Sequence, residues 1–232
     1  MIVGISAGRQ KGVTSAAVKA VLEKSGMEYE YLSLSGKKIS GCIGCVRCGA
    51  DNVCKLKDDW NAIGAKLLKA DAIVFGAPNY GGTINALGHA CLERMFCFRH
   101  REVFSLAGKL GVIVSVEYAR EKENAVHNFI QKVFHTQMIA IVGSVFATGY
   151  SQCYTCGFGE NCGAGNVVRD HGFIDEIKDE HRPPHFKDQP EAVLQAHRAG
   201  KVLGSILRNR EENSAHRTPR ELPKHQAGKV TP

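Results

Sequence analysis

The sequence lacks the features of membrane-spanning, secreted and disordered chains. Its longest apolar runs, residues 110–116 and 138–147, fall well short of the roughly 20 residues that a membrane-spanning helix needs. The first residues enter a strand-like run directly, without the basic segment or the small-residue cleavage site of a secretion signal. Hydrophobic residues make up 44% of the 232 residues and charged residues 23%, proportions that exclude a fibrous or disordered class. We therefore expect one globular cytoplasmic domain with an extension and no membrane contact.

The sequence also lacks two common nucleotide-binding motifs. The loop at residues 6–15 has neither the Gly-Lys-Ser/Thr ending of a Walker loop nor the G-x-G-x-x-G fingerprint, which disfavours ATP and NAD as tightly held ligands. The loop does contain glycine, hydroxyl groups and positive charge, supplied by Ser6, Arg9, Gly12, Thr14 and Ser15. Together with free backbone N–H groups at the start of a helix, these suit a phosphate monoester such as that of FMN. A turn that only caps the helix is the alternative.

Strand-length apolar runs alternate with helix-like stretches over the first 150 residues, which predicts consecutive βαβ units and a parallel sheet. We expect five strands, near residues 2–6, 28–34, 72–76, 110–116 and 139–146. We expect helices near residues 14–25, 58–69, 84–98, 120–135 and 190–208. The prediction is an α/β domain over residues 1–150, a cysteine-rich loop and helical extension over residues 151–208, and a basic arm over residues 209–232.

A second glycine-rich loop, residues 76–83, follows the predicted third strand. Pro78 and the glycines favour an irregular backbone at the edge of the sheet, and Tyr80 offers an aromatic face beside free backbone donors. This combination suits a flat ring, although a plain surface turn would have the same composition. The remaining candidates for cofactor binding lie in this loop and after the fifth strand: Asn79, Gly81, Thr148 and Gly149.

Cysteine is abundant, with nine residues. A reducing cytosol does not favour a disulfide framework, so metal binding or redox chemistry is the expected use. Seven cysteines form two groups, which we call the first cysteine set (Cys42, Cys45, Cys48 and Cys54) and the second cysteine set (Cys153, Cys156 and Cys162). The first set follows the second strand, within an insertion at residues 40–57, and the second set follows the fifth strand. Both sets are therefore predicted at the carboxyl edge of the sheet, where one cofactor could meet both.

The first cysteine set has the spacing C-x2-C-x2-C-x5-C. Three thiolates at three-residue steps can wrap one corner of a cubane, and a fourth after a short turn can close it, as an iron–sulfur cluster requires. We expect a [4Fe–4S] cluster in preference to a [2Fe–2S] cluster. Structural zinc is the alternative, but zinc sites more often use two C-x2-C pairs separated by about a dozen residues or more. Glycines beside the cysteines leave room for backbone N–H groups to approach the cluster sulfurs: Gly41, Gly44 and Gly49.

With these motifs the chain resembles the iron–sulfur flavoproteins, within the NADPH-dependent FMN reductase and flavodoxin-like superfamily. The resemblance covers roughly residues 1–150 and rests on the phosphate loop, on the first cysteine set followed by Asp58 and Asp59, and on Pro78 and Tyr80. It implies a flavodoxin-like fold that holds FMN, and a [4Fe–4S] cluster that lies near the flavin across a subunit interface. The phosphate loop departs from the family pattern, because it has Ser-Ala-Gly-Arg at residues 6–9 where Ser-Pro-Arg is usual.

The second cysteine set is not a general feature of that family. It repeats the spacing of the last three cysteines of the first set, since both have the pattern C-x2-C-Gly-x4-C. Three metal ligands are thus present without a fourth, which a partner chain, His171 or an open iron site could supply. Cys91 and Cys97 are poor candidates, because the helix that carries them runs away from the carboxyl edge. A second metal or iron–sulfur site is one interpretation, and free thiols or a disulfide is the other.

The sequence predicts an oxidoreductase in which FMN and a [4Fe–4S] cluster pass electrons between a ferredoxin-like one-electron carrier and a small-molecule acceptor. The cofactors carry the chemistry, so no protein side chain is required as an acid or base. One alternative is a NAD(P)H-dependent FMN or quinone reductase with structural cysteines. Another is a zinc-bearing nucleic-acid-binding module.

The C-terminal tail is basic. The net charge is +7, and residues 208–232 carry six basic residues against three acidic ones. Such a tail could attract nucleic acid, but a solvated tail is the simpler explanation, so nucleic acid is not the expected partner. The tail has few apolar residues, chiefly Leu222 and Val230, and cannot form a core of its own. We expect it to act as an assembly arm laid over a neighbouring subunit in a homodimer or homotetramer.

Overall fold

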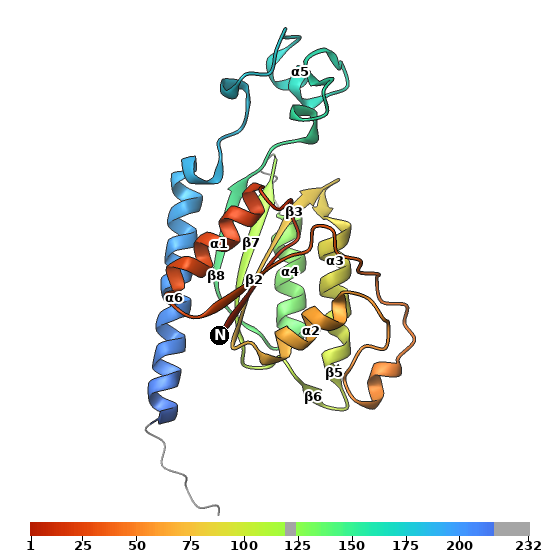
Figure 1. Cartoon of the computed structure of the whole chain (residues 1–232), viewed down its shortest axis with the longest axis vertical. Helices are drawn as coiled ribbons and strands as arrows, with labels where there is room; N and C mark the ends of the chain where they lie inside the picture. The colour runs from red at the N-terminus through yellow and green to blue at the C-terminus, as the bar shows by residue number, and fades with distance from the viewer. Residues whose placement is uncertain (119–123, 216–232) are drawn as a thin grey trace, which may run out of the picture.

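A computed structural model describes residues 1–118 and 124–215 and shows a parallel sheet of five strands (Figure 1). The strands are β1 (Ile2–Ser6), β2 (Tyr29–Ser33), β3 (Ala72–Tyr80), β7 (Leu110–Glu117) and β8 (Ala140–Thr148). Their order is β2-β1-β3-β7-β8, the order of flavodoxin-like doubly wound folds, so the predicted fold class is confirmed. The central strands β3 and β7 are almost continuously apolar, as expected of parallel strands that are buried on both faces.

Helices cover both faces of this sheet (Figure 1). One face carries α2 (Trp60–Lys69), α3 (Ala86–Glu93) and α4 (Ala125–Thr136). The other face carries α1 (Val13–Ser25) and α6 (Pro190–Ala215). Each face encloses its own hydrophobic core, which burial of aliphatic and aromatic side chains stabilises.

The helix predicted at residues 190–208 is part of the second core and not an addition to a finished domain. Its apolar residues Ala196, Ala199 and Leu203 are buried together with those of α1. Gly204 lies so close to α1 that a Cβ atom there would collide with the carbonyl oxygen of Ser25. The sheet therefore needs residues well beyond 150 to cover its second face. The helix continues to Ala215, and the rest of the predicted assembly arm, residues 216–232, lies outside the described residues.

The glycine-rich loop predicted after the third strand is a β-hairpin in the structure. β3 continues to Tyr80 and pairs in antiparallel fashion with β4 (Thr83–Ile84). The connection is the two residues Gly81 and Gly82, whose φ angles are +64° and +83°. A two-residue turn with positive φ at both positions suits the twist of a hairpin and favours glycine.

The remaining elements are short. After α3 the chain makes a 3-10 turn, η2 (Arg94–Phe98), and a small hairpin of β5 (Arg99–His100) and β6 (Val103–Phe104). The other 3-10 turns are η1 (Arg47–Ala50), η3 (Gln152–Tyr154), η4 (Gly159–Asn161), η5 (Asp179–His181) and η6 (Phe186–Asp188). The one α-helix of the described residues not yet named is the short α5 (Asn166–His171). None of the described helices is both long enough and apolar enough to span a membrane.

Candidate cofactor sites

A cavity of about 640 Å³ opens at the carboxyl edge of the sheet, a size within the usual range for small-molecule sites. Residues at the ends of β3 and β7 and in the segments that follow β1, β3, β7 and β8 form its walls. The lining includes residues that the sequence predicts as cofactor ligands: Arg9, Gly12, Thr14, Pro78, Asn79, Tyr80, Gly81 and Gly149. The structure thus brings the two predicted loops together around one space.

The N-terminus of α1 borders this cavity. Gly12 is the N-cap residue, and no side chain in the described part of the chain caps the helix. The first backbone N–H groups of the helix therefore have no side-chain partner, and they lie beside the buried Thr14. The uncapped N-terminus of a 13-residue helix favours an anion such as a phosphate.

Two arginines and two tyrosines give the cavity positive charge and aromatic surface. The guanidinium of Arg9 lies 5.0 Å from the ring centre of Tyr150, and that of Arg169 lies 5.4 Å from the ring centre of Tyr118. The Tyr118 hydroxyl is buried and has no hydrogen-bond partner within the described residues. Buried polar atoms are normally paired, so this hydroxyl indicates a polar ligand. The chemistry of the lining fits a phosphorylated flavin.

The β3–β4 hairpin supplies a further wall. The Gly82 N–H donates to Asn79 Oδ1 over 2.9 Å, and Asn79 Nδ2 donates to Glu117 Oε1 over 3.4 Å. These bonds fix the hairpin against β7. The Tyr80 ring is 44% exposed, so it is available to a flat ligand instead of being committed to the core.

Three of the predicted ligands lie outside the cavity lining. The Ser15 hydroxyl hydrogen-bonds with Tyr31 Oη over 2.7 Å. The backbone of Thr148 is paired with the Gln189 side chain at both its N–H and its carbonyl, each over 2.8 Å. Ser6 is fully buried at the end of β1. A position at the end of a strand or the start of a helix therefore does not decide where a side chain lies.

Several lining residues were not predicted. Tyr118 directly follows β7 and Tyr150 lies two residues after β8, and their place after predicted strands could have identified them. Gln152, Asn166 and Arg169 come from the segment after β8, for which the hydrophobic pattern gave no structure.

The first cysteine set lines a second, separate pocket. Cys97 and Arg94 line it as well, although Cys97 lies about forty residues further along the chain. The enclosed space is about 20 Å³, which is room for a single water molecule. Four thiols around one pocket are the ligand set of an iron–sulfur cluster, which would require a wider opening between them. No group of three or more His, Cys, Asp or Glu side chains in residues 1–118 and 124–215 is placed to hold one metal ion.

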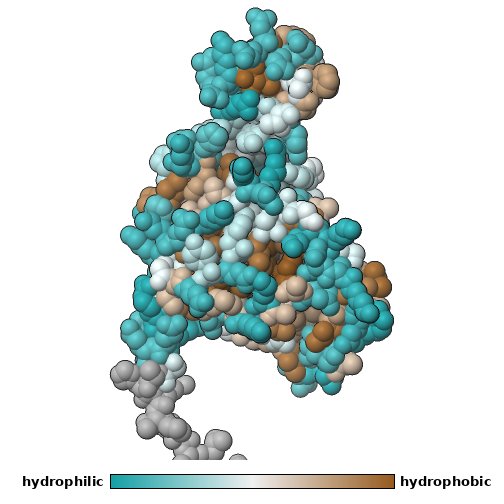
Figure 2. Space-filling model, viewed as in Figure 1, coloured by the Kyte–Doolittle hydropathy of each residue, from teal (hydrophilic) through white to brown (hydrophobic). Residues whose placement is uncertain are grey.

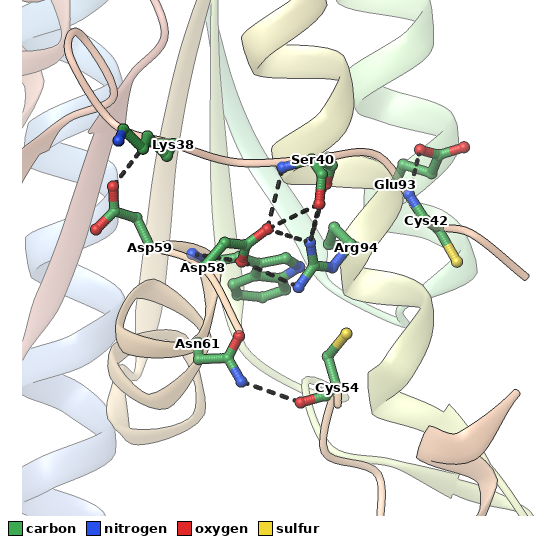
Figure 3. A network of polar contacts seen from close by, with 10 residues as sticks. Lys38, Ser40, Cys42, Cys54, Asp58, Asp59, Asn61, Glu93 and Arg94 are labelled. Atoms are coloured by element: carbon green, nitrogen blue, oxygen red, sulfur yellow. Dashed lines mark hydrogen bonds and ion pairs between the residues drawn. The ribbon is translucent and has the colours of Figure 1, made fainter. Parts of the chain in front are cut away.

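A buried ion pair anchors both ends of the loop that carries the first set (Figure 3). The Arg94 side chain is 1% exposed, and its Nη1 and Nη2 donate to the two Asp58 carboxylate oxygens over 2.7 and 3.2 Å. Arg94 Nη1 also donates to the Ser40 carbonyl over 2.9 Å, and the Ser40 N–H donates to Asp58 over 3.0 Å. The residues before and after the first set are therefore held against the end of α3.

Two further bonds hold the cysteines themselves. The Cys42 N–H donates to Glu93 Oε2 over 2.9 Å, and Asn61 Nδ2 donates to the Cys54 carbonyl over 3.0 Å (Figure 3). Burial raises the pKa of Asp58, but the hydrogen bonds from Arg94 and Ser40 outweigh it and lower this pKa to about 2. The carboxylate is therefore charged at neutral pH and stays paired with Arg94.

The thiols around this pocket differ in acidity. Hydrogen bonds from Arg47 lower the pKa of Cys45. Burial raises the pKa of Cys48 and raises that of Cys97 to about 12, with a smaller contribution from the neighbouring thiols. Metal ligation needs thiolates, so Cys45 is the readiest ligand and Cys97 remains a thiol in the ligand-free chain.

The expectation that both cysteine sets lie at the carboxyl edge is wrong for the first set. α3 begins beside that edge and extends about 12 Å away from it, given 1.5 Å per residue. At its far end the Met95 carbonyl accepts a bond from Gln137, which directly follows α4 and lies near the start of β8. Cys48 Sγ lies 3.0 Å from His100 Nε2, beyond this end of α3. Among residues 1–118 and 124–215, the first set lies beyond the far end of α3 and the second set follows β8 at the opposite edge, so a single cofactor is not expected to meet both in one chain.

The second cysteine set does lie at the carboxyl edge, in the lobe formed by residues 150–185, which projects beyond the sheet (Figure 1). All nine cysteines are free thiols. His171, a candidate fourth ligand, has its Nε2 within 3.0 Å of Tyr154 Oη.

The model of the NADPH-dependent FMN reductases matches residues 1–152. The chain belongs to this family. Among its relatives, an iron–sulfur flavoprotein of Methanocaldococcus jannaschii is 31% identical over 147 residues, which cover 60% of this chain and 74% of the relative. An iron–sulfur flavoprotein of Methanosarcina thermophila is 30% identical over 149 residues, which cover 61% and 76%. The match to one from Archaeoglobus fulgidus, 31% identical, covers 62% of this chain and 63% of the relative.

Solved structures show the same fold in more distant proteins. RosB superposes with a TM-score of 0.60 at 12% identity over 99% of this chain and 98% of its own. A flavone reductase gives 0.57 at 16% identity, over 90% of this chain and 64% of its own. As a member of the FMN reductase family, the chain is a flavin-dependent oxidoreductase. The family match ends at residue 152, so Asn166, Arg169 and the second cysteine set lie beyond it.

Proposed function

We propose that the chain binds FMN in the 640 Å³ cavity and a [4Fe–4S] cluster through the first cysteine set, and passes electrons between the two. The observation that carries this proposal is the presence of both sites in one chain, namely a cavity with two arginines at the carboxyl edge and a pocket lined by the four thiols of the first set and by Cys97. FMN exchanges electrons singly or in pairs, whereas the cluster exchanges them singly, so together they connect a one-electron carrier to a two-electron acceptor.

The FMN phosphate would bind the N-terminus of α1, with Arg9 and Thr14 beside it. The ring would lie against the β3–β4 hairpin, where Tyr80 and the backbone of Gly81 and Gly82 are exposed. Arg169 would add charge from the lobe after β8. Membership of the FMN reductase family supports this assignment.

The first cysteine set would hold the cluster, with the Arg94–Asp58 pair fixing the ends of the loop. Apolar side chains on the same loop are exposed to solvent, namely Ile43 at 64%, Val46 at 67% and Val53 at 46%. Exposed apolar side chains around a redox site favour coverage by another subunit. Because the two pockets are separate within one chain, we propose a homodimer or homotetramer in which the first cysteine set lies near the cavity of a neighbouring subunit.

The proposed donor is a ferredoxin-like carrier, and the proposed acceptor is a small molecule that reaches the flavin in the open cavity. The family description favours NADPH as the rival donor, which would reduce the flavin directly and leave the cysteines a structural role. A zinc-bearing nucleic-acid-binding module has no comparable support, because the chain belongs to an enzyme family.

The decisive experiment is anaerobic purification followed by assays of flavin, iron and acid-labile sulfide. Cys48→Ala should remove about four iron atoms per chain, the content of one cluster, while flavin stays bound. Cys91→Ala is the matched control, because Cys91 is a buried cysteine of the same core outside the pocket, and this variant should keep its iron. Full iron retention in Cys48→Ala would overturn the assignment of the cluster.

The same preparations test the flavin site. Arg9→Ala should weaken FMN binding by about 1.5 to 3 kcal/mol, the scale of a lost hydrogen bond to a charged group. Lys11→Ala removes the same charge from the same loop at an exposed position outside the cavity lining, and it should bind FMN almost normally. Equal affinities in the two variants would place the phosphate elsewhere. Anaerobic mixing with reduced ferredoxin or with NADPH then shows which donor reduces the flavin.

A further inference from the structure

The lobe at residues 150–185 is folded, yet it has almost no hydrophobic core. Its fully or nearly buried apolar side chains are Tyr154, at 3% exposed, and Val167, at 0%. Phe158 and Phe173 are 78% and 70% exposed, and the lobe is largely hydrophilic on the face in Figure 2. Segments shorter than about 40 residues rarely hold a fold without disulfides or metals. All three cysteines of the lobe are free, so a bound metal or a neighbouring subunit is left to stabilise it, and the cysteines favour a metal.

The second cysteine set lies on adjoining turns of this lobe, with Cys153 and Cys162 half-buried and Cys156 exposed. The Asn166 N–H donates to Cys153 Sγ over 3.4 Å, and Cys156 Sγ lies 3.4 Å from the Cys153 carbonyl. Cys162 is tied to the same place, because its carbonyl accepts from the Gly165 N–H over 2.7 Å, one residue before Asn166. Two turns, η3 and η4, and the start of α5 thus bring the three cysteines together.

Backbone groups contact two of these three sulfurs. Backbone N–H groups donate to two of them, from Asn166 to Cys153 and from Phe158 to Cys156, each over 3.4 Å. Backbone donors to sulfur are the outer contacts that orient and tune metal-bound thiolates.

A single zinc ion fits this lobe less well than a cluster does. Structural zinc requires four protein ligands that converge on one point. The chain has no further cysteine available, because Cys91 and Cys97 are buried in the core on the α3 face. Within residues 1–118 and 124–215, no three His, Cys, Asp or Glu side chains are placed to hold one metal ion, so the thiols of the second set do not converge on a single point. In a cubane cluster each cysteine binds a different iron atom, so the three thiolates surround the cluster instead of converging on one point. The fourth iron can bind another ligand.

We propose that Cys153, Cys156 and Cys162 bind a second [4Fe–4S] cluster, whose fourth iron has no cysteine ligand from this chain. The spacing C-x2-C-Gly-x4-C, shared with the last three cysteines of the first set, supports the same kind of ligand. Binding of this cluster does not depend on the proposed function.

The position of this cluster has a functional consequence that does rest on the proposed FMN site. Gln152, directly before Cys153, lines the 640 Å³ cavity, and so does Asn166, whose N–H donates to Cys153 Sγ. The second cluster is therefore the redox centre adjacent to the flavin within one chain. The first set would reach a flavin only across a subunit interface.

The test measures iron, sulfide and zinc in anaerobically purified variants. Cys45→Ser/Cys48→Ser should retain about four iron and four sulfide atoms per chain, held by the second set. Adding Cys153→Ser/Cys156→Ser should remove them. Thr155→Ala, an exposed change between the two cysteines, is the matched control and should keep all the iron. Electron paramagnetic resonance of the reduced Cys45→Ser/Cys48→Ser protein should show one cluster.

Three results would overturn the proposal: absence of iron from the Cys45→Ser/Cys48→Ser protein, zinc in its place, or a disulfide within the second set detected by mass spectrometry. Because the Cys45→Ser/Cys48→Ser protein keeps the lobe intact, it decides the question even where the Cys153→Ser/Cys156→Ser change prevents folding. Failure of the proposed function gives a different result. If the first set binds no cluster, wild-type protein and Cys45→Ser/Cys48→Ser contain equal iron, and the second set accounts for all of it.

Discussion

The two cysteine regions share a spacing but differ in how the protein supports them. The first set lies on a loop whose ends are held from outside, by a buried ion pair and by bonds to α2 and α3. The second set lies in a lobe with few buried side chains, where hydrogen bonds link the turns that carry the cysteines. The comparison shows that the cysteine spacing determines which residues can bind a metal, whereas contacts with the core determine whether the loop is ordered before a metal binds. The first region should therefore depend on its anchor and the second on its metal.

The largest effect is expected from breaking the anchor of the first region. Arg94→Ala leaves the Asp58 carboxylate partly buried without its partner, which should lower the free energy of unfolding by about 3 kcal/mol. Urea unfolding measures this loss. Lys55→Ala removes a half-exposed pair with Asp51 in the same loop and should cost about 0.5 kcal/mol. Similar losses in the two variants would show that burial of the pair does not matter.

Acid should weaken the same anchor by a smaller amount. The folded pKa of Asp58 is about 2, below the ordinary value, so its contribution is complete above about pH 4 and is lost as the pH falls toward 2. The contribution is about 2 kcal/mol, from the size of the shift. The unfolding free energy of iron-free protein should fall over this range by that much more in the wild type than in Asp58→Asn. Parallel curves for the two proteins would contradict the assignment.

The smallest expected effect is the difference in stability loss between a glycine of the lobe and a glycine of the first cysteine loop. At Gly159 a Cβ atom would collide with the Cys153 carbonyl, so Gly159→Ala should distort the lobe at a cost of about 1 to 2 kcal/mol. At Gly49 no atom lies within 4 Å of a Cβ, so Gly49→Ala should cost less than about 0.5 kcal/mol. Limited proteolysis of the lobe and thermal unfolding test this contrast. Equal losses of stability in the two variants would mean that the lobe accommodates the added methyl group without strain.

The sequence predicted the fold well because the fold depends on hydrophobic periodicity. The apolar runs at β1, β3, β7 and β8 and the helices between them have the periods of buried strands and amphipathic helices. The role of α6 was not predicted, because periodicity shows that a helix has an apolar face but not which surface that face covers. The hairpin at Gly81 and Gly82 was mistaken for an irregular loop, although a pair of glycines is a known sign of a two-residue turn.

The candidate sites were predicted less completely, because they depend on contacts between distant segments. Cys97 joins the first set only because η2 turns the chain back toward the cysteine loop after α3. Arg94 pairs with Asp58 across 36 residues, and no local pattern indicates that pairing. Arg169 reaches the cavity from a lobe without clear periodicity. Local motifs identified the ligand types, while the tertiary fold determined which residues surround them.

The place of α6 in the second core also bears on how the chain folds during synthesis. Proteins fold from the N-terminus as the ribosome extends them, and α6 is made after every strand of the sheet. Until it emerges, α1 covers part of this face, and the core that contains Val112, Val114 and Val145 lacks its second helix. The lobe with the second cysteine set is translated before α6, so its cysteines leave the ribosome while one side of the sheet is still only partly covered.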